Sequence, residues 1–90
     1  MSRQRQITIT PGPPAQFRPN PGNVNADDGV FFSNQDTVAH WPTPQGAASD
    51  FWFPERIGPR ETSDAVNMRK GSMTYVCSLH QHETGTIDAT

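Results

Sequence analysis

The residues best suited to chemistry gather near the C-terminal end of the chain. Cys77, His80 and His82 lie within six positions of one another, at the end of a segment rich in strand-forming residues. A thiolate and imidazoles packed this closely are donors that zinc and copper favour. The only other histidine, His40, also lies at a predicted strand end, just before Pro42. Because distant strand ends meet at one pole of an antiparallel sandwich, we expect His40 to meet the Cys77 cluster.

Each of these residues also has a simpler interpretation. A single cysteine is most often a small buried hydrophobic residue, and an isolated His82 fits an exposed loop as well as a metal site. Nucleophilic catalysis by Cys77 would need a histidine base and an oxyanion donor, and Glu83 has no partner carboxylate nearby for acid–base work. Because three of the four Cys and His residues fall within six positions, a metal site is favoured.

The composition restricts the chain to a small domain built from short elements. Ninety residues predict one domain, spanning 1–90, with no second domain to form a cleft. Hydrophobic residues make up 32%, and nine prolines and seven glycines favour short strands and turns over a helical bundle. The single cysteine excludes an internal disulfide, so a bound metal would supply stability that the small core lacks.

Charge and hydropathy argue against two classes of partner. The net charge is −2, and the lysines and arginines are scattered, so we expect no nucleic-acid partner. No apolar run approaches the ~20 residues that a membrane span requires. The N-terminal residues also lack the apolar segment of a secretory signal. We therefore expect no transmembrane segment in this chain.

Short runs of alternating or β-branched residues, separated by turn residues, predict an all-β fold. Turn signals include Asp27-Asp28-Gly29 and Arg69-Lys70-Gly71. The segment 45–60 is the least regular, and we expect its aromatic cluster at 51–54 to cover one end of the core. Predicted strands lie at 6–10, 23–26, 30–34, 38–41, 61–68, 72–77 and 85–90. This spacing is typical of an antiparallel sandwich or barrel.

Segments of this sequence resemble the cupredoxin family, the plastocyanin- and amicyanin-like blue copper proteins. Residues 75–87 are similar to the family's C-terminal copper loop in its short form. Residues 30–36, with His40 six positions after Asn34, resemble its strand, asparagine and first histidine, and 57–63 resemble the stretch leading into its last hairpin. The resemblance covers roughly residues 5–90. It implies an antiparallel Greek-key β-sandwich of seven to eight strands.

The resemblance also implies a copper site of two histidines and one cysteine. His40 and His80 would bind one copper ion through ring nitrogens, and Cys77 would bind it through its thiolate. Asn34 and Ser78 would lie behind these ligands, with Asn34 tying the His40 loop to the Cys77 loop through Ser78. Such hydrogen bonds fix ligand geometry and shift the reduction potential.

The sequence departs from the family pattern at the fourth ligand position. The short-loop pattern has a methionine three residues after the histidine, where this chain has Glu83. A carboxylate is a hard, anionic donor, so it should favour Cu(II) over Cu(I) and lower the potential. We expect Glu83 as the fourth ligand, with His82 as the alternative. A third arrangement has no axial side chain and an approach by the Ala39 carbonyl.

The function that the resemblance implies is one-electron transfer by copper cycling between Cu(I) and Cu(II). His80 would be the partly exposed electron route, with a redox partner protein docking over it. We expect a monomer or weak oligomer, a periplasmic or other extracytoplasmic location, and a metal-binding protein rather than an enzyme. The alternatives are a copper carrier or buffer, a red-copper-type site that reacts with a small molecule, and a structural zinc site of His40, Cys77, His80 and His82.

Overall fold

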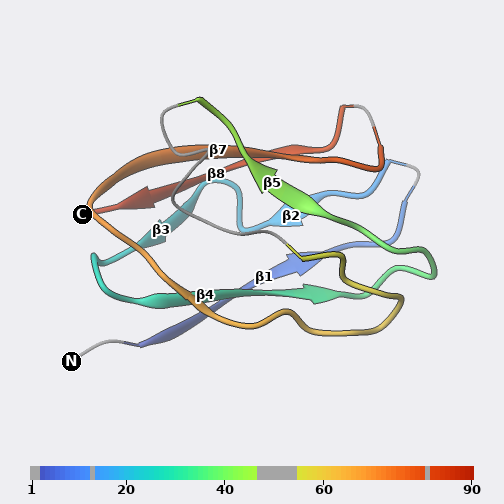
Figure 1. Ribbon diagram of the computed structural model, residues 1–90, viewed down its shortest axis with the longest axis horizontal. Coiled ribbons are helices and arrows are strands. Elements are labelled where there is room, and N and C mark those ends of the chain that lie inside the picture. The colour runs from blue at the N-terminus through green and yellow to red at the C-terminus, as the bar shows by residue number, and fades with distance from the viewer. Residues whose placement is uncertain (1–2, 13, 47–54, 81) are drawn as a thin grey trace.

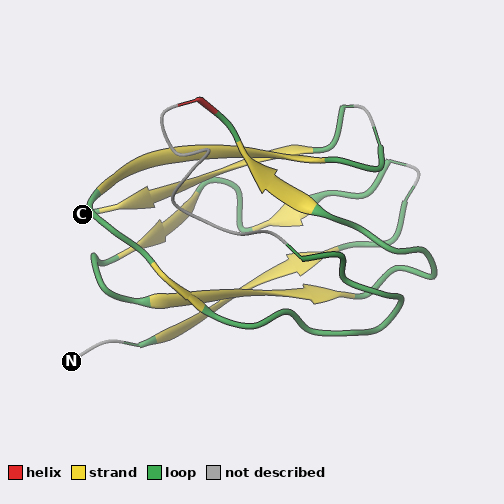
Figure 2. Cartoon of the chain, in the orientation of Figure 1, coloured by secondary structure: helices red, strands yellow, loops and turns green. Residues whose placement is uncertain are grey.

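Two four-stranded sheets lie face to face in the computed structural model, which describes residues 3–12, 14–46, 55–80 and 82–90 (Figures 1 and 2). The first sheet has the order β2-β1-β4-β6, and its strands are β1 (Gln4–Ile9), β2 (Phe17–Arg18), β4 (Gly29–Asn34) and β6 (Val66–Asn67). The second has the order β3-β8-β7-β5, with β3 (Gly22–Val24), β5 (Pro42–Pro44), β7 (Gly71–Cys77) and β8 (Thr84–Ala89). The predicted all-β sandwich of seven to eight strands is confirmed. The aromatic cluster predicted to cap the core lies outside the described residues.

Both sheets are mixed, whereas the sequence predicts purely antiparallel sheets. β1 pairs with β4 in parallel, and β3 pairs with β8 in parallel, whereas the other four pairings are antiparallel. The reason is a crossover: after β2 the chain joins the second sheet as β3 and then returns to the first sheet as β4. Neighbours separated by such a crossover can run in the same direction, which a tight hairpin does not allow.

The core forms where alternate residues of facing strands turn inward. Along β7, Met73, Tyr75 and Cys77 are buried, which is the period-two pattern of a strand with one covered face. The rings of Phe17, Phe32 and Tyr75 meet edge to face, with centroids 4.8 to 6.0 Å apart. Three large rings thus fill the centre of a chain with few apolar residues. Cys77 is the last inward-facing residue of β7, so its thiol lies at one pole of the core.

Two predicted strands are much shorter than expected. The segment 38–41 contributes only an isolated bridge, in which His40 and Ile57 exchange backbone hydrogen bonds of 3.0 and 2.8 Å. The segment 61–68 contributes a bridge between Ser33 and Thr62, followed by the short β6. Among the residues that the structure describes, no helix has the length and apolar character needed to cross a bilayer.

Candidate metal centre

The pairing of β5 with β7 brings His40 to Cys77. Pro42 lies opposite Cys77 in this ladder, and the backbone N–H of Ser78 donates to the Trp41 carbonyl at 2.8 Å. The backbone N–H of Trp41 points at the Cys77 Sγ atom, 3.4 Å away. The two strands are therefore fixed at the cysteine, and His40, two residues before Pro42, lies beside its sulfur.

The loop between β7 and β8 carries the other candidate ligands. It is closed by a hydrogen bond of 2.8 Å from the Cys77 N–H to the Glu83 carbonyl. His82 adopts a positive φ of 70°, a conformation rare for residues that have a β-carbon. At this point the chain turns, so that the Glu83 side chain is buried whereas His82 is exposed.

Four donor atoms converge at this end of the sandwich. The ligand atoms of His40, Cys77, His80 and Glu83 all lie within 4.8 Å of one another. The Cys77 sulfur is 3.7 Å from Nδ1 of His40 and 3.5 Å from Nδ1 of His80. Oε1 of Glu83 is 3.0 and 3.4 Å from the same two nitrogens. Donors bound tetrahedrally at about 2.0–2.3 Å would stand roughly 3.3–3.6 Å apart, and the four separations given above, 3.0 to 3.7 Å, are close to that spacing.

The carboxylate of Glu83 supplies an independent sign that the cluster fits a cation. Its Oε2 accepts the backbone N–H of Ala15 at 3.1 Å. Its Oε1 is buried and makes no hydrogen bond within the described part of the chain. A buried oxygen left without a donor is costly, and a metal ion among the four ligand atoms would satisfy it. The residues therefore fit a bound cation.

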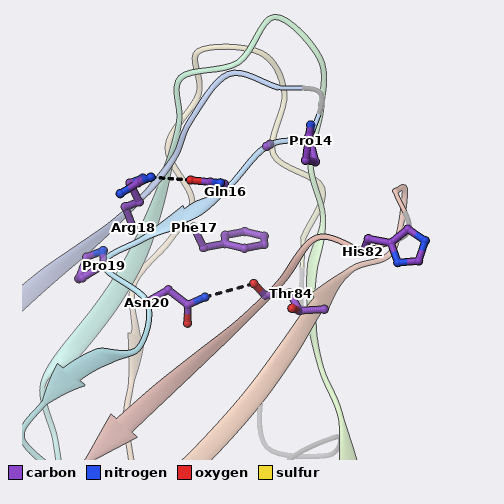
Figure 3. A pocket seen from close by; sticks show the side chains of 9 residues that line it. Pro14, Gln16, Phe17, Arg18, Pro19, Asn20, His82 and Thr84 are labelled. Atoms are coloured by element: carbon purple, nitrogen blue, oxygen red, sulfur yellow. Dashed lines mark hydrogen bonds between the residues drawn. The ribbon is translucent and has the colours of Figure 1, made fainter.

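The structure distinguishes the two side chains considered for the fourth ligand. Glu83 belongs to the cluster, whereas His82 does not. The His82 side chain lies at the rim of a surface pocket lined also by Pro14, Phe17 and Thr84 (Figure 3). The third possibility, an approach by the Ala39 carbonyl, stays a prediction.

Asn34 supports the His40 loop, but through contacts other than the one expected. The Ser78 hydroxyl, its predicted partner, is hydrogen-bonded to the Thr43 hydroxyl instead. The fully buried Asn34 amide donates to the carbonyls of Val38 at 2.9 Å, Ile57 at 3.2 Å and Gly58 at 3.0 Å. Asn34 thus ties the His40 loop to the segment around Ile57, rather than to the Cys77 loop. Sequence analysis missed this contact because segment 45–60 shows no pattern of pairing.

Asp36 is a further site residue that sequence analysis did not identify. Its Oδ2 lies 2.9 Å from Nε2 of His40, on the side of the ring away from the cluster. This hydrogen bond holds the pKa of Asp36 below its usual range, and the backbone N–H groups of Thr37 and Gly12 lower it further, although burial opposes them. An acid four residues before His40 is visible in the sequence, but the loop that turns it back to the ring is not.

Comparison with known proteins identifies the fold. No protein-family model and no curated protein match this sequence. A purple cupredoxin from Nitrosopumilus maritimus superposes with a TM-score of 0.82 at 19% identity, over 94% of this chain and 98% of that one. A reduced Cu(I) form of an amicyanin variant at pH 4 gives 0.80 at 13% identity, over 94% and 80% of the two chains. A second reduced amicyanin variant gives 0.80 at 12% identity, over 96% and 81%. The chain therefore has the cupredoxin fold that its sequence resembles.

Proposed function

We propose that this chain is a mononuclear copper protein that transfers single electrons. The observation that carries the proposal is the convergence of one sulfur, two nitrogens and one carboxylate oxygen within 4.8 Å in a cupredoxin fold. His40, Cys77 and His80 would hold the ion as the His₂Cys set typical of such copper sites. When bound, copper supplies a couple between Cu(I) and Cu(II) that accepts and releases one electron.

The arrangement argues against the structural zinc site that the sequence left open. That site would need His82 as the fourth member of a closed set with His40, Cys77 and His80. His82 is exposed and lies outside the cluster, whereas an oxygen of Glu83 belongs to it, which supports Glu83 over His82. The fold also favours copper, because the matching amicyanin structure is a Cu(I) form.

Glu83 is the fourth ligand in this proposal, and it makes the site different from one with a methionine. The Ala15 N–H occupies Oε2, so Oε1 alone is free to face the metal. An anionic oxygen stabilises Cu(II) more than Cu(I), and it therefore lowers the reduction potential. We expect a copper site whose spectrum departs from the blue type.

Contacts within the protein hold these ligands in place. His40 is 1% exposed, and its ring is hydrogen-bonded to Asp36. Its backbone N–H and carbonyl are both hydrogen-bonded to the backbone of Ile57. Cys77 is fixed by the β5–β7 and β7–β8 ladders. Ligands held this firmly change position little when the metal gains or loses an electron, which favours fast transfer.

His80 gives the site its contact with solvent. Its side chain is 38% exposed, and a surface pocket lined by Ser78, Leu79 and His80 adjoins the cluster. Among the residues that the structure describes, the exposed large hydrophobic side chains are those of Leu79 and Val38, at 43% and 47%. An exposed ligand beside the apolar side chain of Leu79 suits a redox protein that docks briefly over His80. In this proposal the chain works as a monomer or weak oligomer outside the cytoplasm.

Voltammetry of the copper-loaded protein tests the proposed role. An electron-transfer protein should give a reversible one-electron wave with fast exchange, and Cys77→Ser should abolish it. A copper carrier or buffer would instead lose its metal readily to a chelator. A site that reacts with small molecules would change its visible spectrum on addition of small anions. Retention of copper without any reversible wave would contradict electron transfer.

A further inference from the structure

We infer that Asp36 is a positioning residue of this site, which holds the His40 ring so that Nδ1 presents its lone pair to the metal. The inference rests on the proposed function for the identity of the metal. His40 is the most deeply buried of the four candidate ligands.

The two nitrogens of His40 face opposite partners. Nε2 lies 2.9 Å from Oδ2 of Asp36, whereas Nδ1 faces Cys77 Sγ at 3.7 Å and Glu83 Oε1 at 3.0 Å. A neutral imidazole has one N–H and one lone pair, and an ionised carboxylate can only accept. Asp36 therefore requires the proton on Nε2, which leaves the lone pair of Nδ1 directed at the cluster.

Asp36 is itself held firmly enough to impose this orientation. It is 6% exposed, and its carboxylate accepts the N–H of Thr37 at 2.7 Å and the N–H of Gly12 at 3.3 Å. Its own N–H donates to the Asn34 side chain at 3.0 Å. The Asp36 carboxylate thus cannot turn away from His40 without breaking its hydrogen bonds to Thr37 and Gly12.

The loop between β1 and β2 supports both carboxylates that contact His40. Gly12 of this loop donates to Asp36, and Ala15, three residues later, donates its N–H to Oε2 of Glu83. One backbone segment therefore fixes both Asp36, which contacts Nε2 of His40, and Glu83, which faces Nδ1. This arrangement couples the orientation of His40 to the position of Glu83.

The charge of Asp36 acts on the metal as well as on the ring. A carboxylate hydrogen-bonded to a ligating histidine raises the basicity of that ligand, and loss of such a partner costs 10–100-fold in metal affinity. The Cys77 thiolate and Glu83 already supply negative charge to the cluster. The additional charge on Asp36 favours a divalent over a monovalent ion, and it lowers the reduction potential of bound copper.

Zinc is the probe that separates this inference from the copper function, because Zn(II) has no redox chemistry. Zn(II) affinity is measured by competition with a chromophoric chelator for the native protein, Asp36→Ala and Asp36→Asn. Asp36→Ala should lose about 10–100-fold. Asp36→Asn keeps an acceptor for Nε2, so its Zn(II) affinity should fall only several-fold.

Nitrogen-15 NMR of the zinc forms should find a slowly exchanging His40 Nε2–H in the native protein and in Asp36→Asn, but not in Asp36→Ala.

Asp28→Asn is the matched control. Asp28 is also a buried acid, but it lies just before β4, at the opposite end of that strand from Asn34; six residue steps at about 3.3 Å each put the two backbones roughly 20 Å apart. Its loss should leave both the zinc affinity and the His40 signal unchanged. A purely structural effect of removing a buried carboxylate would appear in both variants.

The outcomes distinguish the role of Asp36 from the proposed copper function. If Asp36→Ala binds Zn(II) within twofold of the native protein and keeps its Nε2–H signal, the inference is overturned. If Asp36→Ala does not fold, Asp36→Asn decides: unchanged zinc affinity and an unchanged copper potential overturn the inference, and weaker binding with a raised potential supports it. If the zinc results agree but native protein forms no thiolate–copper band, the copper function fails while the role of Asp36 stands.

Discussion

Glu83 determines what kind of copper site this chain would form. Its Oε1 is buried and makes no hydrogen bond to the described residues, whereas its Oε2 accepts the Ala15 N–H. A side chain placed for stability alone would have both oxygens satisfied. The residue therefore meets the requirements of a ligand that binds through one oxygen.

Substituting Glu83→Met tests this role. Exchange of a hard anion for a soft neutral thioether should move the visible spectrum toward the blue type and raise the reduction potential. His82→Ala is the matched control, because His82 is the alternative fourth ligand that the sequence predicts and it lies outside the cluster. It should alter neither quantity. An unchanged spectrum in Glu83→Met, or a shift in His82→Ala alone, would exclude Glu83 as the ligand.

At the scale of elements, the site depends on how loops are tied to the sheets rather than on the strands alone. Asn34, the last residue of β4, donates to three carbonyls of two loops and accepts the N–H of Asp36. The loop that carries His40 therefore takes its shape from a side chain at the end of a central strand. Loss of that side chain should loosen the site as well as the fold.

Asn34→Ala should lower the free energy of unfolding by about 2–3 kcal/mol, because it removes the four hydrogen bonds of a buried side chain and takes away the acceptor of the Asp36 N–H. Metal affinity should fall with it, since the His40 loop loses its support. Denaturant unfolding of the metal-free protein and zinc competition measure the two effects, with the exposed Asn23→Ala as control. Loss of stability with full metal affinity would show that Asn34 supports the fold but not the site.

The parts of the site that the sequence predicts are those with a local pattern. Cys77 and His80 come from one strand and the loop that follows it, and Glu83 from a fixed offset in the same loop. His40 is predictable because it ends a recognisable segment. Asp36 is not, because its contact depends on the path of an irregular loop. The Ile57 bridge and the parallel pairings are missed for the same reason: they join segments whose partners no alternation of residues specifies.

Across the whole molecule, the metal site and a buried acid occupy opposite ends of β4. Asp28, just before that strand, accepts the N–H groups of Asn25 and Arg3 and the side chain of Arg5. These donors, with the Asn25 N–H first, hold the pKa of Asp28 below its usual value although burial opposes them. The N-terminal strand is thus fastened to the turn before β4 without contact to the site.

The pH dependence of stability follows from this lowered pKa. Asp28 contributes stability above about pH 4, the value for an unfolded aspartate, and the contribution is lost as pH falls through the lower folded pKa. Asp28→Asn should therefore be less stable than the native protein at pH 7. The difference should shrink below about pH 4. Denaturant unfolding of the metal-free protein between pH 2 and 7 measures it, and a constant difference across that range would contradict this role.

Titration of the metal-free protein with Cu(II), followed by visible absorption, tests the central claim most directly. If the cluster of His40, Cys77, His80 and Glu83 binds copper, a thiolate-to-copper charge-transfer band should grow to an end point near one equivalent. The band should be absent in Cys77→Ala at the same copper concentration. A native protein that develops no such band at any pH at which it is folded would contradict the copper site.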